Sequence, residues 1–279
     1  ESPDDALHVI AKVKGLDEDD IRAFRDLLDG TPLSRVVRAA TGIKHRIDFL
    51  LALGELLHSE ESRGDLLERD HLHRLVENNA WGFGNEWALV RSEAGLISVL
   101  REHLRLLRPE EQPNVASSDV DGGRRRVDLL FAGSIAEHRR RRRLVVELKR
   151  ASVGLGLAER TQIETYATAI AQSPRFQGEE VQWDFWLVGT TIEDSISGSV
   201  NQKDSPPGLF ANNEMPNGSS YRIWVKSWSE VLAASSEDIR FFQEEIEYDP
   251  DVAEALSEIR RRFPDAVPPS RKHAESGEE

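Results

Sequence analysis

Charged residues within two short apolar stretches are the feature that most constrains how this chain can fold. The first, RVDLLF, holds Asp128 between apolar neighbours, and the second, LVVELK, holds Glu147 and Lys149. Side chains alternate between the two faces of a strand, so Glu147 and Lys149 share one face while Val146 and Leu148 point into the core. If the two stretches are neighbouring strands of a meander, Asp128 lies beside Glu147, and two carboxylates and one ammonium meet.

Two carboxylates this close repel each other unless a cation lies between them. Hard, oxygen-preferring ions suit such a site, so we expect Mg²⁺ or Mn²⁺ held by Asp128, Glu147 and the main-chain carbonyl of Leu148, with water completing the shell. Such an ion activates water for phosphodiester hydrolysis, and Lys149 would orient that water or screen the charge that develops on the phosphate.

The short pattern has a simpler alternative, because a Glu/Lys pair also occurs on edge strands that face solvent. A second feature favours the site. Gln162 and Tyr166 are four residues apart in an expected helix and share one face of it. This spacing resembles the Q-x-x-x-Y motif in the RecB-like branch of the PD-(D/E)xK nucleases. The resemblance implies that Gln162 belongs to the catalytic set and that Tyr166 contacts nucleic acid.

The pattern across residues 66–247 resembles the Shedu family of bacterial anti-phage defence nucleases. It rests on LHRLVENNAWGFGNEW, on the two charged strands, and on YRIWVKSWSEVL with the IRFFQEEI that follows. The resemblance implies a DNA endonuclease used in phage defence, assembly into homo-oligomers (dimers or tetramers), and a regulatory region elsewhere in a longer native chain. The chain departs from the superfamily motif in having Val127 where a proline often precedes the first Asp.

A helix ahead of the sheet often supplies one more glutamate to the metal in this superfamily. Glu77 matches that place and is expected to be a catalytic and metal-binding residue. Glu86 and Glu93 are nearby alternatives.

A run of five arginines precedes Glu147 and is expected to lie between the second and third strands. It consists of Arg139, Arg140, Arg141, Arg142 and Arg143. Arginine pairs with phosphate in a bidentate manner, so we expect this run to contact the nucleic-acid backbone near the site, although a solvated loop is the alternative. The net charge of −14 argues against a protein that coats nucleic acid non-specifically.

The element pattern predicts an α/β fold, and the resemblance implies a restriction-endonuclease-like PD-(D/E)xK core in which helices flank a mixed central sheet. We expect a helical region or linker over residues 1–64, the nuclease domain over 65–248, and a helix with a disordered tail over 249–279. The polar stretch 195–220 indicates a loop or lid.

Composition excludes several classes of protein. The absence of cysteine excludes disulfides and thiolate metal sites. No apolar run approaches the roughly 18 residues that span a bilayer, so we expect no membrane association and a cytoplasmic location. His71 and His73 do not share a helical face, and the tryptophans suit core packing better than base stacking.

Two further functions remain open beside the defence nuclease. One is a DNA repair or mismatch nuclease of RecB-like type. The other is a nucleic-acid-binding or oligomerisation module that keeps the fold but does not cleave. The chain begins with Glu1 rather than Met, so we expect it to be cut from a longer protein.

Overall fold

The computed structural model describes residues 17–63, 66–107, 126–133, 141–172, 181–214 and 220–267. Its contacts divide the chain into two compact units. The first consists of residues 1–47 and 239–249, and the second of residues 48–238 and 250–279. The division into 1–64, 65–248 and 249–279 stays a prediction.

The first unit contains α2 (Glu18–Gly30), within the region 1–64 that was expected to be helical. Asp17 caps the helix by accepting the backbone N–H groups of Asp19 and Asp20 at 2.9 and 2.8 Å. Asp20 in turn accepts the backbone N–H of Asp17, which completes a capping box. The next helix is α3 (Leu33–His58), of which residues 33–47 belong to the first unit and residues 48–58 to the second.

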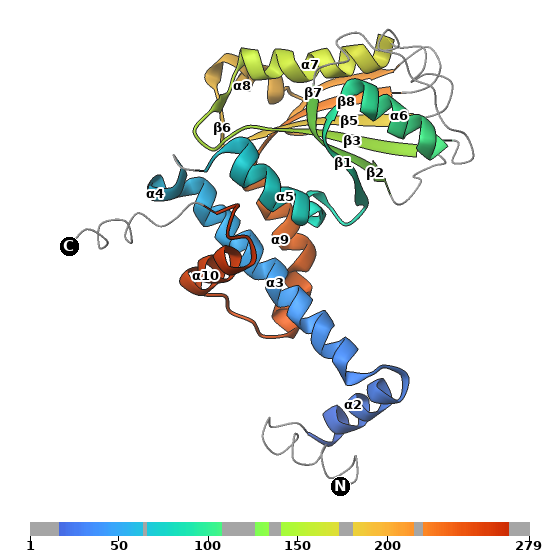
Figure 1. The fold of residues 1–279 in the computed structure, drawn as a ribbon, viewed down its shortest axis with the longest axis vertical. Coiled ribbons are helices and arrows are strands. Elements are labelled where there is room, and N and C mark those ends of the chain that lie inside the picture. The colour runs from blue at the N-terminus through green and yellow to red at the C-terminus, as the bar shows by residue number, and fades with distance from the viewer. Residues whose placement is uncertain are drawn as a thin grey trace, which may run out of the picture. The chain divides into compact units, whose positions relative to one another are not determined.

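The second unit is built on a six-stranded mixed sheet in the order β1-β2-β3-β5-β8-β7 (Figure 1). The pairs β1/β2, β2/β3 and β7/β8 are antiparallel, whereas β3/β5 and β5/β8 are parallel. The strands are β1 (Trp87–Gly95), β2 (Arg126–Gly133), β3 (Arg141–Leu148), β5 (Val181–Gly189), β7 (Leu209–Glu214) and β8 (Ser220–Ser227). Because β3 has neighbours on both sides, the alternative of an edge strand with a solvent-facing Glu/Lys pair is wrong.

Helices cover both faces of this sheet, which makes the fold mixed α/β. On one face lie α6 (Leu96–Leu107), α7 (Leu157–Gln172) and α8 (Asp194–Val200). On the other lie α5 (Arg74–Asn78) and the parts of α3 and α9 (Trp228–Glu245) that belong to this unit. The remaining elements are α4 (Glu60–Arg63), η1 (Glu68–His73), η2 (Ala80–Phe83), β4 (Gly154–Leu155), β6 (Thr191–Ile192) and α10 (Val252–Arg262).

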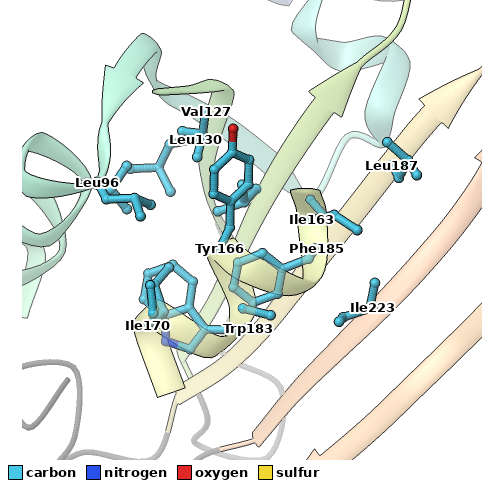
Figure 2. Packing of buried hydrophobic residues seen from close by; sticks show 14 of the residues in the cluster. Leu96, Val127, Leu130, Ile163, Tyr166, Ile170, Trp183, Phe185, Leu187 and Ile223 are labelled. Atoms are coloured by element: carbon cyan, nitrogen blue, oxygen red, sulfur yellow. The ribbon is translucent and has the colours of Figure 1, made fainter. Parts of the chain in front are cut away.

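The core beneath α7 is formed by alternate residues of the strands (Figure 2). In β5, Trp183, Phe185 and Leu187 all point to this side, and the rings of Trp183 and Phe185 stack with centroids 6.1 Å apart. Ile163 and Tyr166 meet them from α7. Figure 2 shows Tyr166 with its hydroxyl directed toward Val127 of β2. The alternation typical of β-strands thus anchors α7 over the carboxyl end of β3.

Phe83 is the centre of the core on the opposite face. Its ring lies 5.4 Å from Phe131, 6.3 Å from Trp186 and 6.2 Å from Trp228, measured between centroids. Phe83 comes from η2, the turn in which the sequence gathers aromatic residues, so this turn locks the segment ahead of β1 onto the sheet.

Two expectations for connecting segments have different outcomes. The loop or lid expected over residues 195–220 is wrong for its described part, which contains most of α8 and all of β7. Ile196 and Val200 of α8 are buried, and β7 pairs with β8, so a stretch of mainly polar composition is held by a few apolar contacts and by main-chain hydrogen bonds. Asp121-Gly122-Gly123, where Asp-Gly between two expected strands predicts a tight hairpin, lies outside the described residues.

None of the helices in the described ranges has both the length and the apolar content that crossing a membrane requires.

We expect Phe83→Ala to destabilise the protein by about 3 to 5 kcal/mol, because truncating a buried ring removes its burial and leaves a cavity among three other rings. Phe241, whose exposed fraction is 63%, provides the matched control. Phe241→Ala should change the free energy of unfolding by less than about 0.5 kcal/mol. Urea denaturation measures both, and equal losses for the two variants would contradict the assignment of Phe83 to the core.

Candidate active site

Asp128 and Glu147 lie next to each other across β2 and β3. The register places Leu129 opposite Val146. Because the strands are antiparallel, the next pair along them is Asp128 and Glu147. Oδ2 of Asp128 accepts the backbone N–H of Leu148 at 2.7 Å, which fixes the first carboxylate against the second strand. The sequence-based expectation that these two side chains meet is confirmed.

Lys149 and Gln162 complete a hydrogen-bonded group around Glu147. Lys149 follows β3 directly, and its Nζ donates to Oε1 of Glu147 at 3.0 Å and to Oε1 of Gln162 at 2.8 Å. Nε2 of Gln162 donates to Oε1 of Glu147 as well. One carboxylate oxygen therefore receives two donors from two different elements, which fixes the position of the ammonium.

Tyr166 supports Gln162 from one helical turn away. Its hydroxyl accepts Nε2 of Gln162 at 2.9 Å and donates to the backbone carbonyl of Arg126 at 2.6 Å. Tyr166 is only 2% exposed. The expected contact of Tyr166 with nucleic acid is therefore corrected: the ring is packed in the core beneath α7, and its hydroxyl ties α7 to the start of β2.

Burial raises the pKa of both carboxyl groups. For Glu147, which is 3% exposed, desolvation is the largest cause and the charge of Asp128 is the second, and together they raise the pKa to about 8. For Asp128 desolvation raises the pKa most, and the hydrogen bond from Leu148 opposes it. The Lys149 ammonium lowers both values but does not cancel the burial. The positive charge near Asp128 and Glu147 is therefore too small to compensate for the desolvation of both carboxylates.

Glu68 is a third carboxylate of this site, and the sequence did not reveal it. Its charge raises the pKa of both Asp128 and Glu147, and its Oε2 accepts the backbone N–H of Arg150 at 3.2 Å. Glu68 opens η1, a π-helical turn, and such turns often occur at functional sites. Sequence periodicity assumes 3.6 residues per turn. It therefore cannot predict which glutamate of a π-helical turn faces the site.

Glu77 is not brought to the carboxylate pair in the way the sequence led us to expect. Its side chain is 42% exposed, and its carboxylate lies 3.9 Å from Nε2 of His73. The charge that acts on both carboxylates of the pair is that of Glu68, nine residues earlier in the chain. Of the alternatives, Glu93 pairs with Arg126 at 2.8 Å.

His71 and His73 each make a hydrogen bond within the fold, and the charge of His73 lowers the pKa of Asp128. Nδ1 of His71 accepts the backbone N–H of Leu67, and buried His73 shares a hydrogen bond with Ser92.

The described part of the arginine run lies in a strand and not in a loop beside the site. Arg139 and Arg140 are outside the described residues, whereas Arg141, Arg142 and Arg143 form the beginning of β3. At the usual rise of a strand, Arg143 and Glu147 are about 13 Å apart. Arg143 is buried, and its charge, with that of Arg141, adds to desolvation in lowering the pKa of His103 to about 3. Arg142 faces the other side of the sheet, near Asp184.

The donors present fit a hard divalent cation, although no three His, Asp or Glu side chains within the described ranges form a ready-made metal cluster. Oε2 of Glu147 is buried and has no hydrogen-bond partner among the described residues. Mg²⁺ is commonly held by one or two carboxylates with water in the remaining positions. Asp128 and Glu147 would therefore hold the ion. The group of Leu148 seen at the site is its N–H, and a role for its carbonyl stays a prediction.

Comparisons with known proteins add no relative. No protein-family model, curated protein or solved structure matches the chain. Any statement about its activity therefore rests on its own residues and their geometry.

We expect Glu147→Gln to stabilise the protein in EDTA, and more at pH 8 than at pH 5. The pKa of Glu147 rises from 4.5 to about 8, so the folded state holds this proton more tightly than the unfolded state does. Its contribution to stability is therefore greatest below pH 4.5 and is lost as the pH rises to 8. The amide carries no such penalty, and the gain at pH 8 should be roughly 1 to 3 kcal/mol.

Urea unfolding at the two pH values measures this difference. Glu245→Gln, at an exposed position, is the control and should show no comparable pH dependence. A gain for Glu147→Gln that is the same at both pH values would show that Glu147 is ionised throughout.

Proposed function

We propose that this chain is a metal-dependent DNA endonuclease that hydrolyses phosphodiester bonds. The single observation that carries the proposal is the buried Asp128/Glu147 pair: among the residues that the structure describes, Lys149 supplies its one ammonium, and Oε2 of Glu147 has no hydrogen-bond partner. A protein that used these residues only for stability would gain from replacing the pair with apolar side chains. Retention of two raised carboxyl pKa values in one place is typical of catalytic sites.

The residues of this chain have distinct roles in that reaction. Mg²⁺ or Mn²⁺, when bound by Asp128 and Glu147, supplies a Lewis acid and a water of lowered pKa. Lys149 places its ammonium where a phosphate oxygen gains negative charge, and Gln162 holds that ammonium in position. Tyr166 in turn holds Gln162, and Glu68 adds a further acidic group at the edge of the site.

The fold and the resemblance support a more specific assignment. A meander that carries the Asp and the E-x-K strand, followed by a helix that supports the site, is the arrangement expected for a PD-(D/E)xK core. The stretches that resemble Shedu nucleases support a role in anti-phage defence, with homo-oligomers, a cytoplasmic location and a regulatory region of a longer chain. A repair nuclease of RecB-like type would use the same chemistry and stays the alternative. A module that does not cleave is disfavoured, because the site residues are all present: Asp128, Glu147, Lys149 and Gln162.

Cleavage of plasmid DNA should require Mg²⁺ or Mn²⁺ and should stop in EDTA. We expect Glu147→Gln and Lys149→Met each to slow it by about 100-fold or more, because the first removes a ligand of the ion and the second removes the ammonium that acts on the developing charge. Lys203→Met, at an exposed lysine, is the charge-matched control and should cleave normally. Cleavage that persists in EDTA, or that survives both site substitutions, would contradict the proposal.

The same cleavage assay distinguishes the role of Glu68 from that of Glu77. We expect Glu68→Gln to slow cleavage by about 10- to 100-fold, the range found for groups that support a metal site. Glu77→Gln should leave the rate unchanged, because Glu77 lies beside His73 and is partly exposed. The reverse ranking would restore Glu77 as the third acidic residue and remove Glu68 from the site.

A further inference from the structure

Strand β8 presents basic and aromatic side chains on the sheet face opposite to the active site. Tyr221, Ile223 and Val225 pack with the core beneath α7, so Arg222, Trp224 and Lys226 point the other way. In the parallel ladder Trp224 lies opposite Trp186 of β5. We call Arg222, Trp224, Lys226 and Trp186 the basic-aromatic face; all four are partly exposed although both strands are interior.

A buried carboxylate holds this face rigid. Asp184 of β5 accepts Nε and Nη2 of Arg222 at 2.7 and 3.0 Å and Nε1 of Trp224 at 3.1 Å. Its exposed fraction is 1%, so the carboxylate is desolvated and depends on these donors. One residue therefore fixes both the guanidinium and the plane of the indole. The ring and the cation are ordered before any ligand arrives, which lowers the entropic cost of binding.

Lys226 lies against aromatic rings rather than against a carboxylate. Its Nζ is 4.7 Å from the ring centroid of Trp186 and 5.1 Å from that of Trp224. No ion pair of Lys226 is found within the described part of the chain. The nearby Glu230 is occupied by the backbone N–H and the hydroxyl of Ser227. A half-buried ammonium in this position would gain from an anion supplied by a ligand.

We propose that the basic-aromatic face binds an unpaired nucleic-acid strand, with Lys226 and Arg222 against its phosphates and Trp224 against a base. Cations that follow the backbone, together with aromatic rings on which bases stack, are what single strands require, and such binding tolerates any sequence. In a chain of net charge −14, the cations of Arg142, Arg222 and Lys226 outnumber the nearby carboxylates of Asp184 and Glu230 on this face, and this excess is complementary to phosphate. The inference rests on nucleic acid being the substrate of the proposed nuclease, and it adds a strand-holding surface on the other side of the sheet.

The binding of a fluorescein-labelled oligothymidylate, measured by anisotropy in EDTA, tests this surface without cleavage. We expect Lys226→Ala to weaken binding about tenfold and to lower the slope of log affinity against log salt by about 1, as for the loss of one phosphate contact. Trp224→Ala should weaken binding about tenfold, and Trp224→Phe should lose less, because it keeps a ring for stacking. Circular dichroism checks that each variant is folded.

Lys203→Ala is the matched control, because it removes the same charge from an exposed turn and should bind as the wild type does. Normal binding by Lys226→Ala, or an equal loss in Lys203→Ala, would overturn the proposal. Equal competition by polyglutamate through Lys226 would overturn it in favour of an acidic peptide. A protein that binds the oligonucleotide through Lys226 but does not cut DNA with Mn²⁺ would keep this inference and refute the nuclease, so the two failures are distinguishable.

Discussion

Two desolvated carboxylates that share a single ammonium are the interaction on which the rest of the site depends. Antiparallel pairing of β2 with β3 makes Asp128 and Glu147 neighbours, and α7 closes over them, so neither group can move to water. Desolvation and mutual repulsion raise both pKa values, and Lys149 offsets only part of this cost. A divalent cation is the ligand that would relieve this strain, and a phosphate ester is the substrate that such an ion attracts.

The surrounding fold holds these groups in place from several directions. The hydroxyl of Tyr166 connects α7 to β2, and Gln162 carries that connection to Glu147 and Lys149. Beneath them, the stacked rings of Trp183 and Phe185 fix α7 on the sheet, while Phe83 packs against the opposite face. A site held by a rigid sheet and one helix has a preorganised geometry.

The centre of this site could be predicted from the sequence because its residues follow the regular spacing of side chains along a strand and along a helix. Alternation along a strand placed Glu147 and Lys149 together, and spacing of four along a helix placed Gln162 with Tyr166. Prediction failed where local periods carry no signal. The π-helical turn that brings the charge of Glu68 near the pair has no sequence signature, and charge alone cannot show that Arg143 lies in a strand and is buried.

Direct measurement of Mn²⁺ binding by calorimetry tests the central claim most closely, since it needs neither DNA nor turnover. Shared coordination by Asp128 and Glu147 predicts saturable binding that is weakened at least about tenfold in both Asp128→Asn and Glu147→Gln, as expected when a metal site loses a ligand. Glu245→Gln should bind as the wild type does. Unchanged affinity in the two site variants would contradict a cation held between β2 and β3.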